Sequence, residues 1–273
     1  MPFIIIWLFS LFSIPLFAED ADIVAFGDHS LWVLANDIKN TFKKDTGISL
    51  YLIPEFAIEG KGCAKGILHA SGGSPDRDIG LVCCKLNPDI VKKYGIKVYP
   101  VVREPLAIIV NKANPVSGLT LKQVKDIFSG RITRWSKVGG PNEPIVVITR
   151  LHCTEHIPNW TKILGSPLEF TKRSLNVSSE PDMAKTVSDF KQAIGHLEMT
   201  SIAEWGKGVK ILSIDGYMPT SKDLIEGHYP FWATLSIVTK GEAKGKAKRF
   251  IDYIRTSTNI REILLKYGMH QTP

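Results

Sequence analysis

Four cysteines, Cys63, Cys83, Cys84 and Cys153, have the most specific chemistry in this sequence. Thiolates are soft ligands that prefer Cu(I), Zn(II) and similar species, and a trivalent metalloid such as arsenite, held by three thiolates, fits the same set. Imidazole suits several of the same metals, so histidines could complete the coordination sphere. The candidates are His29, His152 and His156. These residue types allow a site for a thiophilic metal or metalloid.

The same cysteines allow two other interpretations. An even number of cysteines in an exported protein usually indicates disulfides, and four cysteines can pair in three ways. A bond between the adjacent Cys83 and Cys84 is strained, so Cys63 would pair with one of them. One such bridge could coexist with a ligand, whereas reversible oxidation of a pair would make a redox sensor.

Acid–base catalysis has little support in the sequence. Asp28, Asp78 and Glu155 could donate or accept protons. However, no nucleophile, base and orienting group occur at the spacings that hydrolase motifs require. We therefore expect a binding protein rather than an enzyme.

The amino-terminal segment predicts export. Residues 1–18 contain no Asp, Glu, Lys or Arg, and an apolar run from Phe3 to Phe17 includes Pro15 shortly before Ala18. This pattern indicates a signal peptide cleaved before Glu19. The run is shorter than the roughly 20 residues of a spanning helix, and no other stretch is long and apolar enough to span a bilayer. We expect a periplasmic or otherwise extracytoplasmic protein.

Composition points to a globular chain without nucleic acid as a partner. The 273 residues are 44% hydrophobic and 22% charged, with a net charge of +7, which suffices for two modest domains or one large one. The lysines are spread along predicted helices without the interleaved aromatic residues of a nucleic-acid groove.

Strands alternate with helices along the chain. A strand over 21–26 is followed by a helix capped by Ser30 and ending at Gly47, and Thr120 with Gln123 forms a capping box for another helix. Further strands are predicted over 48–53, 78–82, 106–110, 145–148, 194–197, 209–214 and 231–238, and further helices over 247–254 and 260–267. This alternation predicts an α/β fold with a mainly parallel sheet covered on both faces.

Residues 104–150 resemble a known family. The segment contains EPLAIIVNKANP, IFSGRITRWSKVGG and, at its end, VVITR. It is similar to the central segment of the phosphate-binding proteins that serve bacterial ABC importers. The runs IGHLE at 194–198 and YPFW at 229–232 extend the resemblance over most of the mature chain.

Two pocket segments of that family resemble the amino-terminal part of this chain. Residues 27–30, GDHS, stand where the family has a Gly-Ser-Ser/Thr-Thr turn, so Ser30 is kept while Asp28 and His29 replace hydroxyl residues. Residues 60–66, GKGCAKG, resemble a Gly-Ser-Gly-Ser-Gly loop with Cys63 at a serine.

Two further pocket segments also carry cysteine. Residues 78–84 resemble Asp-Ile-Gly followed by a Ser-Ser or Ser-Asp pair, here Cys83 and Cys84. Residues 150–156, RLHCTEH, resemble an arginine followed by Ser-Gly-Thr-Arg. Arg150 and Thr154 are kept there, whereas Cys153 and Glu155 replace the glycine and the second arginine.

The resemblance implies the type II periplasmic-binding-protein fold. In that family two α/β lobes close on an anion held by hydroxyls, an arginine and the N–H groups of helix N-termini. After the predicted signal peptide over 1–18, it implies a first lobe of residues 19–102 with 239–273 and a second lobe of residues 103–238. The hinge strands would lie near 101–110 and 229–238.

The resemblance also implies one pocket and its partners. The ligand-binding candidates are Cys63, Cys83, Cys84, Cys153, Ser30, His29, Arg150 and Thr154, and the metal-ligand candidates are Cys63, Cys84, Cys153 and His152. We expect a small inorganic ligand, with a thiophilic metal or metalloid as the leading candidate. The alternatives are phosphate or a related oxyanion with structural disulfides, and a redox-sensing or interaction module without a transported solute. A membrane permease of an ABC importer or a membrane sensor is the expected partner of a monomer.

Overall fold

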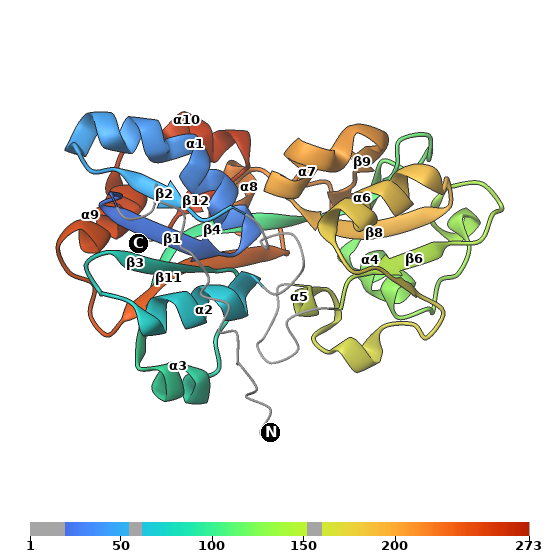
Figure 1. Ribbon diagram of the computed structural model, residues 1–273. Helices are drawn as coiled ribbons and strands as arrows, with labels where there is room; N and C mark the ends of the chain where they lie inside the picture. Colours follow the sequence, from blue (N-terminus) through green and yellow to red (C-terminus); the bar gives the residue numbers. More distant parts are fainter. Residues whose placement is uncertain (1–19, 55–61, 152–159, 273) are drawn as a thin grey trace, which may run out of the picture.

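Two lobes lie side by side in the computed structural model, which describes residues 20–54, 62–151 and 160–272 (Figure 1). The first lobe contains β1 (Ile23–Gly27), α1 (His29–Thr46), β2 (Leu50–Leu52), α2 (Gly62–Gly72), β3 (Asp78–Val82), α3 (Pro88–Tyr94), α9 (Gly245–Thr256), α10 (Arg261–Lys266) and β12 (His270–Gln271). The second contains β5 (Gly118–Leu119), α4 (Leu121–Phe128), β6 (Val146–Thr149), α5 (Thr161–Leu164), β7 (Leu175–Asn176), α6 (Glu180–Asp189), β8 (Ala193–Glu198), α7 (Met199–Trp205), β9 (Val209–Ile211) and β10 (Ser213–Ile214). The strands β4 (Ile96–Asn111) and β11 (Trp232–Lys240) run between the lobes, and α8 (Ser221–Ile225) precedes β11.

Within the described residues, one continuous sheet passes through both lobes in the order β2-β1-β3-β11-β4-β8-β6-β7, with β9 and β12 also paired to β4. Pairing is parallel at the outer strands of each lobe, as for β1 with β2 and β3, and for β6 with β7 and β8. It is antiparallel wherever β4 or β11 takes part. The sheet is thus mixed rather than mainly parallel, because the two crossover strands run against their neighbours, and the expected two-lobe α/β architecture is confirmed.

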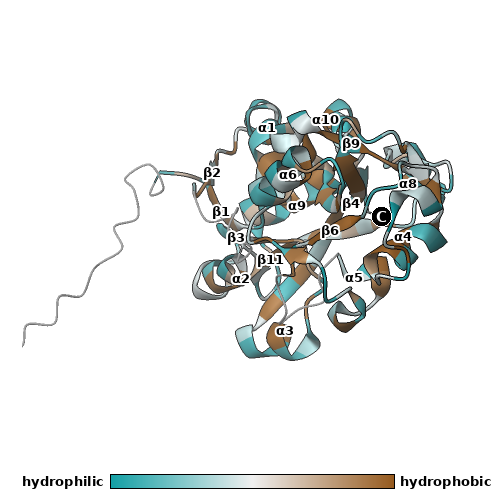
Figure 2. Cartoon of the chain, turned by 90° about the vertical axis from the view of Figure 1, so that its right-hand side faces the viewer, coloured by the Kyte–Doolittle hydropathy of each residue, from teal (hydrophilic) through white to brown (hydrophobic). Residues whose placement is uncertain are grey.

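The strand β4 shows how one segment contributes to more than one core. Successive side chains of a strand point to opposite faces of the sheet. Leu106, Ile108 and Val110 accordingly join the hydrophobic cluster around α4, whereas Ala107 and Ile109 join the cluster under α6. A third cluster fills the first lobe. Apolar residues follow the strands between polar helix surfaces (Figure 2).

Local sequence signals explain two helix starts. The capping box of Thr120 and Gln123 forms as predicted at the start of α4. The prediction that Ser30 caps α1 was wrong: Asp28 has the extended backbone of an N-cap, and its carboxylate accepts a hydrogen bond from the N–H of Leu31. Ser30 lies in the first turn, where its hydroxyl is available for other contacts.

Three predictions concern residues that the structure does not describe. They are the signal peptide over 1–18, part of the glycine-rich loop at 60–66, and the segment with His152, Cys153 and Thr154. Among the described residues, no helix combines the length and apolar character needed to cross a bilayer.

Close backbone contact fixes α2 against β3. A Cβ atom on Gly80 of β3 would lie 2.2 Å from the carbonyl oxygen of Gly66 in α2. A side chain at Gly80 is therefore incompatible with this packing. Because α2 and β3 touch here, the start of α2 lies beside the end of β3, and these are the two places that carry cysteine.

We expect Gly80→Ala to lower the free energy of unfolding by about 2–3 kcal/mol, the typical cost of overpacking a core. Urea unfolding followed by circular dichroism measures the change. Gly72→Ala is the matched control, since nothing lies within 4 Å of a Cβ at Gly72, which is also in α2. Equal stabilities of the two variants would show that the close contact does not constrain the fold.

Candidate ligand-binding site between the lobes

The start of α1 contacts the second lobe directly. Thr200, in α7, places its Oγ1 2.9 Å from the Oγ of Ser30. The Nε2 of His29 lies 2.9 Å from a carboxylate oxygen of Glu204, and its ring stacks on Trp205 at 4.8 Å between centroids. His29 and Ser30 therefore hold the two lobes together in this conformation.

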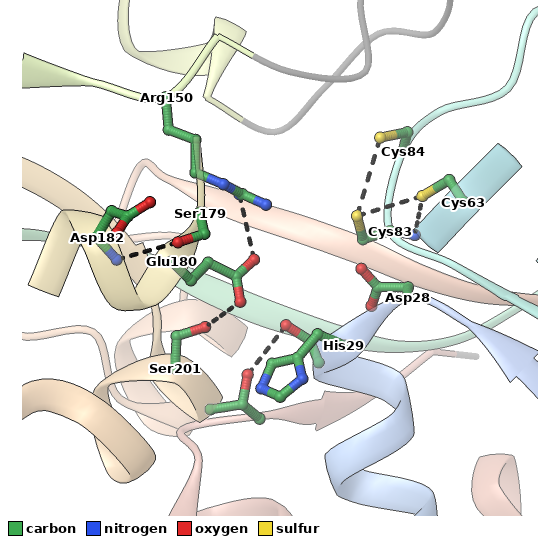
Figure 3. A network of polar contacts seen from close by, with 12 residues as sticks. Asp28, His29, Cys63, Cys83, Cys84, Arg150, Ser179, Glu180, Asp182 and Ser201 are labelled. Carbon is green, nitrogen blue, oxygen red and sulfur yellow. Dashed lines mark hydrogen bonds and ion pairs between the residues drawn. The ribbon is translucent and has the colours of Figure 1, made fainter. Parts of the chain in front are cut away.

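Three thiols gather at the neighbouring corner of the first lobe (Figure 3). Cys63 is the second residue of α2, and Cys83 and Cys84 follow β3 directly. The Sγ of Cys83 lies 3.5 Å from that of Cys63 and 3.8 Å from that of Cys84, and all three sulfurs are within 4.8 Å of one another. The backbone N–H of Cys83 donates a hydrogen bond to the Sγ of Cys63.

Cys63, Cys83 and Cys84 are all buried, and no disulfide joins them to one another. A disulfide would bring two sulfurs to about 2.05 Å, so the 3.5 Å separation of Cys63 and Cys83 is a contact between thiols and not a bond. Contact with the Cys63 thiol, together with burial, raises the pKa of the Cys83 thiol well above its ordinary value.

Three carboxyl groups are buried at the same interface. Burial raises the pKa of Asp28 to about 7, that of Glu104 to about 8 and that of Glu198 to about 7. Glu104 is fully buried in β4, and its Oε1 accepts hydrogen bonds from the N–H and hydroxyl of Thr200. Its Oε2 has no hydrogen-bond partner among the described residues. A carboxyl in such surroundings favours its protonated form.

An arginine faces the thiols and Asp28 from the second lobe (Figure 3). Arg150 follows β6, and its Nη1 lies 3.2 Å from Oε1 of Glu180, the first residue of α6. Ser201 donates a hydrogen bond to the other oxygen of Glu180. Both charged side chains are buried, so each fixes the orientation of the other.

The structure thus brings together several predicted site residues. Cys63, Cys83, Cys84, His29 and Ser30 line the first-lobe side, and Arg150 lies opposite. The predicted candidates Cys153, Thr154 and His152 lie outside the described residues.

A second set of polar residues at this interface was not predicted from the sequence. They are Glu104, Glu180, Glu198, Thr200 and Ser201. One signal was present for two of them: Glu104 precedes the apolar strand segment 106–110, and Glu198 follows the mostly apolar run 193–197. A single acidic residue at the end of a buried strand needs a partner or a proton.

Comparisons with known proteins identify proteins of one kind, the PBP-type binding proteins, as similar to this chain. A family model described as a PBP superfamily domain matches residues 19–258. The phosphate-binding protein PstS of Bacillus subtilis is 29% identical over 182 residues, which cover 65% of this chain and 60% of that protein. The chain therefore aligns with about three fifths of the length of this relative.

Two solved structures share the fold. One is a Clostridium perfringens protein assigned as a phosphate ABC transporter substrate-binding protein and solved with bound phosphate. It is 24% identical, with a TM-score of 0.73 over 92% of this chain and 99% of that one. The other is an ABC-type phosphate transport receptor from Vibrio cholerae, 23% identical, with a TM-score of 0.65 over 92% of this chain and 100% of that one.

Proposed function

The chain belongs to the PBP superfamily, and from this membership we propose that it is an extracytoplasmic solute-binding protein that captures a small inorganic ligand between its lobes. The names of the relatives support phosphate or a related oxyanion as the ligand and the permease of an ABC importer as the partner. The proposed lobes are residues 19–102 with 239–273, and residues 103–238, after removal of a signal peptide over 1–18. Binding and release, without chemical conversion of the ligand, is the expected activity.

One observation supports an oxyanion most directly: three helices begin at the interface that Arg150 faces. They are α1 at His29, α2 at Gly62 and α6 at Glu180. The exposed N–H groups and the helix dipole make a helix N-terminus attractive to anions. Arginine adds a planar set of donors that matches an oxyanion, and Glu180 holds it in place.

The buried carboxyl groups restrict which oxyanion can bind. A carboxylate such as Asp28 can accept a hydrogen bond from an oxyanion that still carries a proton, as phosphate and arsenate do near neutral pH. Sulfate is fully ionised and offers no proton, so at a pH above the raised pKa of Asp28, about 7, it would meet the ionised Asp28 as an uncompensated like charge. The arrangement therefore favours phosphate-like ligands over sulfate.

We expect the reduced, purified protein to bind one inorganic phosphate per chain, and to prefer it over sulfate by about 100-fold or more, because an unpaired buried acceptor is costly. Isothermal titration calorimetry with each anion at pH 8 measures both affinities. Asp28→Asn is the informative variant, since an amide can donate a hydrogen bond to sulfate. Asp28→Asn should therefore reduce the preference for phosphate over sulfate. Equal affinities for the two anions in the parent protein would contradict the proposal.

A second candidate ligand is a thiophilic metal or metalloid. It is favoured by a separate observation, the gathering of three cysteine sulfurs within 4.8 Å of one another. Thiol counting and elemental analysis of anaerobically purified protein separate the candidates. Three reactive thiols that a metal or metalloid protects favour this ligand, whereas reversible oxidation without any bound solute would favour a redox-sensing module.

A further inference from the structure

We propose that Cys63, Cys83 and Cys84 form a three-sulfur site for a trivalent metalloid, arsenite or its antimony counterpart, provided by the first lobe alone. The inference rests on the second candidate ligand above and names its chemical class. It assigns the thiols a ligand different from the oxyanion expected beside Arg150.

The spacing of the sulfurs suits one shared central atom. Two thiolates bound to the same centre at about 2.3 Å each, the zinc–sulfur length, lie roughly 3.3–3.8 Å apart. The observed separations are 3.5 Å for Cys63 and Cys83 and 3.8 Å for Cys83 and Cys84. The sulfurs of Cys63 and Cys84 lie within 4.8 Å of each other, so a modest approach of this pair would let all three share a ligand. The contact between Gly66 and Gly80 keeps their two segments together.

The number of ligands favours a metalloid over zinc. Structural zinc sites are almost always four-coordinate, whereas a trivalent metalloid is satisfied by three thiolates. Among the described residues, no imidazole or carboxylate atom joins the three sulfurs within the same 4.8 Å. The three described sulfurs match the three thiolates that a trivalent metalloid requires.

Charge balance supports the same choice. Arsenite is uncharged near neutral pH as As(OH)₃. In the exchange three As–O bonds break and three As–S bonds form, each thiol proton leaves with a hydroxide as water, and no electrons are transferred. The product is neutral. Zinc held by three thiolates would instead leave a net negative charge in a buried site beside Asp28, which is costly.

A cavity beside Cys83 and Cys84 offers a solute a route that avoids the groups proposed to bind an oxyanion. It has a volume of about 540 Å³, and Cys83 and Cys84 form part of its wall together with Trp232 and Thr161. Arg150, Glu180 and Asp28 do not line it. A small neutral solute could therefore reach Cys83 and Cys84 without contacting Arg150.

The test uses anaerobically purified full-length protein titrated with sodium arsenite. We expect one arsenic per chain after desalting, three thiols lost to a thiol reagent, and an X-ray absorption spectrum with three sulfur neighbours and no oxygen. Zinc should bind more weakly and keep a water oxygen. Fewer than three sulfur neighbours, or isolation of the protein with a Cys63–Cys83 disulfide, would overturn the proposal.

Variants make the assignment specific to these cysteines. Cys84→Ser and Cys63→Ser should each weaken arsenite binding by about 100-fold or more, the order of magnitude that one linked contact adds. Cys153→Ser tests whether three thiols suffice, and it should keep one arsenic with three sulfur neighbours. If it loses a sulfur neighbour, the proposed set is wrong. Thermal melting of each variant controls for folding.

Phosphate titration of the same preparation separates this inference from the oxyanion proposal. Arsenite binding without phosphate binding would remove the oxyanion proposal and leave the three-sulfur site. Phosphate binding without arsenite binding would remove the three-sulfur site and leave the oxyanion proposal.

Discussion

Arg150→Ala is expected to lower the free energy of unfolding by about 3–5 kcal/mol at pH 8, the usual cost of breaking a buried ion pair by removing one partner. The side chains of Arg150 and Glu180 are only 4% and 7% exposed, so solvent screens the pair very little. Without the guanidinium, the carboxylate of Glu180 is left buried beside Glu198, whose pKa is already raised by burial and by Glu180. Urea unfolding of the two proteins at pH 8 measures the loss.

Two further variants test the cause of that loss. Adding Glu180→Gln to Arg150→Ala removes the uncompensated charge and should restore part of the lost stability. Lys185→Ala removes an ion pair with Asp189 on the exposed side of the same helix, and should cost less than about 0.5 kcal/mol. A loss below about 1 kcal/mol for Arg150→Ala would show that solvent reaches the pair.

Glu104→Gln is expected to stabilise the protein at high pH and to leave it nearly unchanged at low pH. Burial raises the pKa of Glu104 to about 8, from an ordinary value near 4.5. Between these values the folded protein binds more protons than the unfolded chain, so its stability falls as the pH rises from about 5 to about 8. Glutamine stays neutral, and its amide oxygen can still accept the hydrogen bonds from Thr200.

The difference in the free energy of unfolding between the two proteins should approach roughly 5 kcal/mol at pH 8.5, since a tenfold change in a proton-binding constant corresponds to about 1.4 kcal/mol. Denaturation curves of both proteins at pH 5 and pH 8.5 test this. The raised pKa values of Asp28 and Glu198 act in the same direction and remain in both proteins, so the comparison isolates Glu104. Glu242→Gln, at an exposed pair with Lys97, is the control and should not reproduce the effect. Parallel pH profiles for Glu104→Gln and its parent would mean that Glu104 is solvated.

Features set by local sequence were predictable. The α4 capping box depends on two residues three positions apart, and β3 was predicted with its observed bounds because its apolar residues are contiguous. The full length of β4 was not predictable, because Pro100, Arg103 and Pro105 interrupt its apolar pattern. Its antiparallel partner β11 is more than a hundred residues away, so only the folded chain reveals the pairing.

The residues of the candidate site also divide into those that local sequence indicates and those that only the folded chain reveals. The resemblance to a family indicated the segments that carry Cys63, Cys83 and Arg150, because those segments keep recognisable motifs. Glu180 was missed because nothing near it in the sequence shows that it is buried, and Glu104 was missed because its place before an apolar strand does not show what it contacts. Their burial comes from residues of other elements, such as Thr200 against Glu104 and Arg150 against Glu180.

The single strand β4 crosses from the core of the first lobe into both clusters of the second. Neither lobe can lose its structure without withdrawing a central strand from the sheet of the other. The molecule should therefore denature as one cooperative unit, even though its hydrophobic clusters are separate.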